Sequence, residues 1–217
     1  MNKTAEEIIG KAKRIQNGDV SRAMKGMGIH YDLNYGVSIP QLRQLANQYN
    51  SNNDLAMYLL NTEIREAKII GSMLVDFETI TSDQLWEISV KANNLELIEQ
   101  FSQNIFAHFS ELHSLLLMLN EGTNWQRLLA VYSACWQIRK QKNTGNQIVE
   151  WAKDQLNLLT NSNDSMMQKS AGFLLQSIAT VNVDYKMQMM QWANQLLKSD
   201  NESEQCIAQE FLWLNLA

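Results

Sequence analysis

The residue type that most restricts the fold of this chain is proline, which occurs once, at Pro40, in 217 residues. Sheet proteins need many tight turns, and such turns draw on clusters of Gly and Pro that this sequence lacks. Residues that favour helices, chiefly Leu, Gln, Ala, Glu, Lys and Met, crowd the chain after Pro40. The composition therefore predicts an all-α protein built from many short helices.

Helix starts are marked by a Ser or Thr followed three residues later by Gln, the spacing of a capping box. In this motif the hydroxyl accepts a bond from a free amide, and the Gln side chain bonds back to the capping residue. Five pairs fit: Ser38 with Gln41, Thr81 with Gln84, Thr123 with Gln126, Thr144 with Gln147, and Ser165 with Gln168. Amphipathic runs predict helices over residues 64–73, 95–106, 125–138, 148–159 and 167–178.

The C-terminal half of the chain repeats itself. Trp151 and Trp192 open similar runs 41 residues apart, Gln126 and Gln168 lead partner helices 42 residues apart, and Gln205 opens a third such helix. Two helices in about 40 residues is typical of HEAT or armadillo repeats, which stack to leave one concave surface for a ligand. Because no loop is long enough to act as a linker, we expect residues 1–217 to form a single HEAT-like domain.

Charge is distributed unevenly along the chain. The formal net charge is −5, yet residues 1–50 hold seven basic and four acidic side chains, and residues 51–217 hold eleven and nineteen. The first segment therefore carries +3 and the second −8. A polyanion is expected to approach the N-terminal part first.

Signatures of metal sites, cofactor sites and membrane spans are missing from the sequence. Cys135 and Cys206 lie in apolar helical patterns without a CxxC spacing, which favours a reducing, cytoplasmic setting. The histidines His30, His108 and His113 are scattered, and no nucleophile elbow, zinc motif or phosphate loop occurs. No window reaches the roughly 18 apolar residues of a membrane span. We expect no metal, no cofactor and no membrane contact.

Three features of residues 35–106 suggest a family. They are an element containing Gly36, Val37, Pro40 and Arg43, a helix over residues 66–72, and an acidic turn at Asp76. Together they resemble the DNA alkylation repair family, the HEAT-like alkylpurine DNA glycosylases of the AlkD type. The resemblance implies a helical array that grips the backbone of double-stranded DNA in a positively charged concave cleft. It also implies hydrolysis of the N-glycosidic bond of N3- or N7-alkylated purines, without a cofactor.

The resemblance also implies where an active site would lie. In the family, aromatic rings flank the sugar, and an aspartate stabilises the oxocarbenium-like centre and positions water. Here Glu99 stands at the aspartate position and is the candidate catalytic carboxylate, one methylene longer than aspartate. The other family positions would form the wall of the site: Leu95 and Phe173 at its tryptophans, Leu128 at its arginine, and Met27 at an aromatic residue. Leucine offers no π-face to a cationic sugar.

Two alternatives about individual residues stay open at this stage. Glu96 and Glu99 lie at i and i+3 of one helix, so they form either a carboxylate pair or, the favoured interpretation, a solvated acidic face. The six Trp residues lie in or beside apolar stripes, where core packing is favoured over stacking on bases.

Three functions fit these observations. The protein is an active alkylpurine glycosylase, a noncatalytic DNA-binding relative, or a helical repeat scaffold for a protein partner, and whether it is an enzyme stays open. A monomer is the expected state. Candidate contacts to the DNA backbone are the basic residues Arg14, Arg22, Lys25, Arg43, Arg65, Lys68, Arg127, Lys140 and Lys169.

Overall fold

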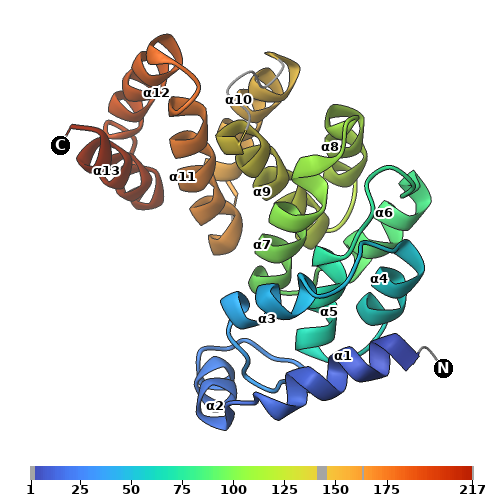
Figure 1. Cartoon of the computed structure of the whole chain (residues 1–217). Coiled ribbons are helices and arrows are strands. Elements are labelled where there is room, and N and C mark those ends of the chain that lie inside the picture. Colours follow the sequence, from blue (N-terminus) through green and yellow to red (C-terminus); the bar gives the residue numbers. More distant parts are fainter. Residues whose placement is uncertain (1–2, 141–145, 163, 217) are drawn as a thin grey trace. The chain divides into compact units, whose positions relative to one another are not determined.

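The structure, a computed structural model, describes residues 3–140, 146–162 and 164–216 (Figure 1). These residues form thirteen α-helices and one short 3-10 helix. The described part of the chain has no strand beyond a single parallel bridge between Leu33 and Ile64. The prediction of an all-α protein is therefore confirmed. None of the described helices combines the length and the apolar character that a bilayer span requires.

The helices group into two compact units, which we call unit 1 (Met1–Phe109) and unit 2 (Ser110–Ala217). We describe each unit by itself, and the expectation of one domain over residues 1–217 stays a prediction. Unit 1 contains α1 (Lys3–Arg14), α2 (Gly18–Gly26), α3 (Ile39–Ala46), α4 (Asn53–Leu60), α5 (Arg65–Met73), α6 (Ser82–Val90), α7 (Leu95–Asn104) and η1 (Phe106–His108). Unit 2 contains α8 (Leu112–Asn120), α9 (Asn124–Lys140), α10 (Asn146–Thr160), α11 (Ser165–Ala179), α12 (Val183–Leu196) and α13 (Glu202–Leu216).

Helix α5 is the centre of unit 1. It contacts α1, α3, α4 and α7, and every residue from Arg65 to Ser72 is buried. The close contact with α4 (Figure 1) depends on Gly71, because a Cβ atom there would lie 2.9 Å from the carbonyl oxygen of Ala56. Ile69 and Ile70 supply fully buried apolar side chains. Close packing thus fixes α5 on several sides at once.

Helix α11 has the same position in unit 2. It contacts α9, α10, α12 and α13, and its apolar side chains Ala171, Leu174, Leu175 and Ile178 are fully buried. The pair α12 and α13 lies side by side at the C-terminal end (Figure 1). Apolar residues at the 3.6-residue period account for this packing.

Three of the five predicted capping sites are confirmed. Thr81 and Thr123 form complete boxes with Gln84 and Gln126, with backbone-to-side-chain bonds of 3.0–3.4 Å. Ser38 caps α3, where its amide donates to the Gln41 side chain.

The two remaining capping predictions have different outcomes. Thr144 lies outside the described residues. The prediction for Ser165 is wrong, because the N-cap of α11 is Asp164 and Ser165 is the first helical residue. The Asp164 carboxylate accepts bonds from the amides of Met166 and Met167. A negative side chain is favoured there because it faces the positive end of the helix dipole.

All five predicted helical runs are helical in the structure. They correspond to α5, α7, α9, α10 and α11, with ends displaced by a few residues at most. The run over residues 95–106 ends earlier than predicted. Ile105 leaves helical geometry with φ −121° and ψ −72°, and the 3-10 helix η1 follows.

Candidate functional site

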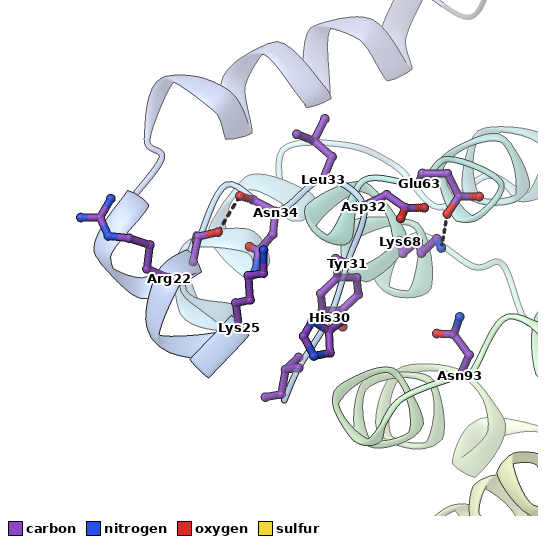
Figure 2. Close-up of a pocket in the computed structure, with 12 residues that line it drawn as sticks. Arg22, Lys25, His30, Tyr31, Asp32, Leu33, Asn34, Glu63, Lys68 and Asn93 are labelled. Carbon is purple, nitrogen blue, oxygen red and sulfur yellow. Dashed lines mark hydrogen bonds and ion pairs between the residues drawn. The ribbon is translucent and has the colours of Figure 1, made fainter. Parts of the chain in front are cut away.

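A polar pocket of about 520 Å³ lies in unit 1, between α2, the following loop and the start of α5 (Figure 2). Its charged lining side chains are Arg22, Lys25 and Lys68, which are basic, and Asp32 and Glu63, which are acidic. The other lining residues are Ser21, Ile29, His30, Tyr31, Leu33, Asn34 and Asn93. Three of the predicted backbone-binding residues are thus brought together in one place.

The wall of this pocket is the loop of residues 29–34. Its main chain pairs with the segment before α5, since the Leu33 amide donates to the Glu63 carbonyl and the Arg65 amide donates to the Leu33 carbonyl. On the other side the Ser21 hydroxyl donates to the Asn34 carbonyl at 3.0 Å. These bonds hold the loop between α2 and α5, and its labelled side chains can be followed in Figure 2.

Gly36 lets the chain turn from this loop into α3. Its φ is +72°, and a Cβ atom there would lie 2.0 Å from the carbonyl oxygen of Asn17. The Asn17 amide in turn donates to the Tyr35 carbonyl at 2.7 Å. Any other residue would be strained in backbone conformation and would collide with the start of α2. This explains why the glycine of the Gly36–Pro40 element is required.

A buried charge network holds the residues that directly follow this loop, Tyr35 and Val37. The Arg65 guanidinium donates twice to the Glu96 carboxylate, at 2.6 and 2.8 Å, and once each to Glu66 and the Val37 carbonyl. Glu66 is fully buried and also accepts from the amides of Tyr35 and Val37. The network therefore ties the loop to α5 and to α7. Buried charges with this many bonds satisfy each other rather than solvent.

Tyr31 links the network to the pocket. Its hydroxyl donates to the Glu96 carboxylate at 2.7 Å. Burial raises the pKa of Tyr31, and the negative charge of Glu96 raises it further, so this hydroxyl stays a donor at neutral pH. Burial alone would lower the pKa of Arg65, but its bonds to Glu96 and Glu66 raise the pKa overall.

The three basic side chains of the pocket differ in how freely they can reorient. Lys68 is buried and pairs with the exposed Glu63 at 3.2 Å. Arg22 is exposed and bonds Asp19, one helical turn earlier. Lys25 is exposed and has no ion pair among the described residues. Arg22 and Lys25 are thus free to reorient toward an anion, whereas Lys68 contributes a fixed charge at the pocket wall.

The chain is similar to known proteins in both sequence and fold. The sequence matches the family described as "DNA alkylation repair enzyme" over residues 9–188, which is most of the chain. The chain belongs to this family. The resemblance first seen in residues 35–106 is therefore confirmed.

A solved structure has the same fold. It is described as coming from "a new family of proteins related to the HEAT-like repeat DNA glycosylases with affinity for branched DNA structures". The TM-score is 0.78 at 13% identity, over 94% of this chain and 92% of that chain. The prediction of a HEAT-like helical repeat fold is confirmed by this match. A comparison with curated proteins gives no match.

The positions predicted to match the family's active-site residues fall on both units. In unit 1, Met27 is 72% exposed just after α2, and Leu95 is 38% exposed at the start of α7. Glu99 lies one turn later on α7 and is exposed, although neighbouring protein atoms partly desolvate its carboxyl. This desolvation raises the pKa of Glu99, and the Glu96 charge adds to the effect. The two glutamates are not an equivalent pair, because Glu96 is committed to Arg65.

In unit 2 the family positions are less accessible. The prediction that Leu128 lines a site wall is wrong, since its side chain is 1% exposed within α9. The Phe173 ring contacts the Tyr132 ring at 5.1 Å and the Trp136 ring at 6.2 Å. The Arg139 guanidinium lies 4.6 Å from the Phe173 ring centre. Phe173 is therefore half-buried, in contact with three side chains of its own unit.

The remaining backbone candidates divide by burial. The prediction for Arg65 is wrong, because the side chain is 3% exposed and Nε and both terminal nitrogens are bonded within the protein. Arg43 is exposed and reaches the Asn104 side chain at 3.5 Å. The Nε of Arg127 donates to the Asn120 carbonyl. Arg14, Lys140 and Lys169 are exposed.

Sequence reasoning missed Tyr31 and Arg139. No local pattern indicates the bond from Tyr31 to Glu96, which spans 65 residues. A signal for Arg139 exists, because Tyr132, Trp136 and Arg139 lie at i, i+4 and i+7 and so share one face of α9.

Neither a metal-binding cluster nor a reactive buried thiol occurs within the described residues. No three His, Cys, Asp or Glu side chains within them are close enough to hold a metal ion. Complete burial raises the pKa of Cys135 to about 12. A thiol of this kind is inert at neutral pH.

Proposed function

We propose that this protein binds DNA through the phosphate backbone and that the unit 1 pocket is one of its contact areas. The observation that supports this most directly is the gathering of Arg22, Lys25 and Lys68 in one polar pocket of an otherwise acidic chain. Membership of the DNA alkylation repair family supports the same class of ligand. Mobile Arg and Lys side chains are suited to phosphates because each contact releases counterions.

Branched DNA is the preferred substrate class under this proposal. The structural relative is described as having affinity for branched DNA structures. We therefore expect a four-way junction to compete better than a linear duplex with the same arm sequences. Equal competition by the two DNAs at the same salt concentration would contradict the preference and leave backbone binding in place.

Efficient base excision is not part of the proposed function. A cationic sugar needs π-faces and a carboxylate close to it. Leu95 has no ring, the half-buried Phe173 ring is already in contact with Tyr132, Trp136 and Arg139, and Leu128 is buried and uncharged. These substitutions and contacts support a DNA-binding relative over a glycosylase.

The proposal is tested by the salt dependence of binding. The double variant Arg22→Gln/Lys25→Gln removes two mobile charges from the pocket, and Lys3→Gln/Lys13→Gln removes two from α1, which does not line it. We expect the slope of log K against log salt to fall by about 1.8 in the pocket variant. Affinity should fall roughly ten- to hundredfold at 0.1 M salt. Fluorescence anisotropy with labelled duplex and junction DNA measures both quantities.

Two results would overturn backbone binding at this pocket. The first is an equal loss in the control variant, which would mean that net charge alone matters. The second is the absence of any salt-dependent affinity in the wild-type protein, which would favour a scaffold for a protein partner.

Excision through Glu99 is the second candidate function. It is favoured by the exposed carboxyl on α7 at the family's aspartate position. If the purified protein releases N3- or N7-alkylpurines from alkylated DNA, Glu99→Gln should abolish the release. Equal release by the variant would show that Glu99 is not the acting carboxylate.

A further inference from the structure

The described residues of unit 2 hold an arginine whose head group is fixed but not neutralised. The Arg139 guanidinium stacks on the Phe173 ring at 4.6 Å, and its Nε donates to the Ser177 hydroxyl at 2.9 Å. No carboxylate among the described residues lies within 4 Å of Arg139. The side chain is nevertheless exposed to solvent.

The Ser177 hydroxyl fixes the orientation of the Arg139 guanidinium. Its hydroxyl donates to the Phe173 carbonyl at 2.7 Å, which leaves the oxygen lone pairs to accept from Arg139. Phe173 and Ser177 are one turn apart on α11, whereas Arg139 comes from α9. Two neighbouring helices thus hold one guanidinium plane.

The two terminal nitrogens of Arg139 make no hydrogen bond to the described residues. Nε is used by Ser177, so the terminal nitrogens are the donors left for a ligand. A guanidinium presents these donors in a flat fork that matches two oxygens of one anion. Because stacking has already ordered the side chain, a ligand does not have to order it again.

We propose that Arg139 is a pre-oriented binding site for a phosphodiester group of DNA. This proposal rests on the proposed function and adds a contact in unit 2 that neither the family positions nor the basic candidates of the sequence include.

A groove adjoins the site through Phe173, although Arg139 itself does not line it. This groove, of about 270 Å³, is lined by Lys169, Gly172, Phe173, Gln176, Ile207, Glu210 and Phe211. A Cβ atom at Gly172 would meet nothing within 4 Å, so the groove is open there. Lys169 adds positive charge and Glu210 opposes it. These two charges offset each other. Arg139 differs from both because its position is fixed by Phe173 and Ser177.

Three variants and one control test the site. Arg139→Gln removes the charge, Arg139→Lys keeps the charge but loses the planar fork, and Glu210→Gln removes the opposing carboxylate. Lys198→Gln is the control, because it removes one exposed charge from the end of α12 in the same unit. All three positions are exposed, so folding is expected to persist, and circular dichroism checks it.

The readout is anisotropy of a labelled duplex and a labelled four-way junction at several salt concentrations. Arg139→Gln should lower the salt slope by about 1 and weaken binding roughly tenfold. Arg139→Lys should keep most of the slope and lose several-fold in affinity. Glu210→Gln should bind more tightly than wild type. Lys198→Gln should match wild type within twofold.

The outcomes separate this proposal from the proposed function. If wild type binds DNA and the Arg22→Gln/Lys25→Gln variant is weakened while Arg139→Gln is not, the Arg139 site is wrong and the pocket stands. Arg139→Lys indistinguishable from wild type would also overturn it, because a diffuse charge would then suffice. If wild type shows no affinity for either DNA, both proposals fail. Competition by inorganic phosphate as strong as by DNA would assign the site to a small anion instead.

Discussion

The central helices of the two units each pack against several neighbouring helices, but the polar side chains that they bury differ. Helix α5 of unit 1 buries Arg65, Glu66 and Lys68, and pairs each charge. Helix α11 of unit 2 buries neutral Ser170 and Ser177, whose hydroxyls bond carbonyls of their own helix. The charged centre fixes a loop and shapes a pocket, whereas the neutral centre leaves one stacked arginine at the surface. Ser177 also accepts from Arg139 of α9, so the neutral centre orders a single side chain, whereas the charged centre organises a loop.

The largest expected effect comes from truncating one arginine in each unit, Arg65 and Arg139. Arg65→Ala leaves the fully buried Glu66 without its cation and should lower the free energy of unfolding by about 3–5 kcal/mol. Arg139→Ala, the matched change in unit 2, should cost at most about 1 kcal/mol because the side chain is exposed. Urea denaturation measures both. Similar losses in the two variants would refute the contrast between the units.

Glycine-to-alanine changes on the same two helices should have opposite signs. Gly71 on α5 faces α4 so closely that an added methyl group must displace the backbone or Leu59 and Leu60, at a cost of about 1–3 kcal/mol. Gly172 on α11 faces open space, and alanine there should raise the free energy of unfolding by about 0.5–1 kcal/mol. Thermal unfolding of the two variants checks the signs. A stabilised Gly71→Ala protein would contradict the close α4–α5 contact.

Removing the hydroxyl oxygen of Tyr31 tests how strongly the charge network holds the pocket loop. Tyr31→Phe keeps the ring but loses the bond to Glu96, and should cost about 1.5 kcal/mol. Tyr58→Phe is the control, since Tyr58 lies on α4 of the same unit, partly exposed, and should change stability by less than about 0.5 kcal/mol. Both values come from urea denaturation. If Tyr31→Phe matches the control, the hydroxyl does not hold the loop.

The smallest expected effect on stability comes from Glu99, the second glutamate of α7. Because the folded pKa of Glu99 is raised above 4.5, its contribution favours folding below pH 4.5 and is lost as the pH rises through the folded value. Glu99→Gln should therefore be slightly more stable than wild type at pH 7, by at most about 0.5 kcal/mol. The difference should shrink as the pH falls below 4.5. A constant difference from pH 3 to 7 would argue that Glu99 is fully solvated.

Much of the local structure follows from the sequence. The runs around Ile69, Phe101 and Leu174 predicted α5, α7 and α11, because an apolar 3.6-residue period is visible within a single helix. The capping Thr81 and Thr123 mark their helices, since each bonds groups three residues away. Asp164 escaped notice because Ser165 beside it fits the capping-box pattern equally well.

The candidate sites were less predictable. The sequence identifies Lys25 and Lys68 as basic residues, but only folding places both at one pocket. Arg65 looked like any other basic residue, yet its partner Glu96 lies 31 residues away on another helix. Arg139 was missed because its stacking partner Phe173 comes from a different helix.

The sequence by itself determined that this chain is helical, where many helices begin and end, and which family it resembles. Caps, periodicity and the Gly36–Pro40 turn act over a few residues, so they can be seen in the order of the amino acids. Tertiary structure decided which charges are buried and paired, as at Arg65, and which remain available to a ligand, as at Lys25 and Arg139. The availability of a charge depends on which helices pack against it, and that packing joins residues far apart in the chain.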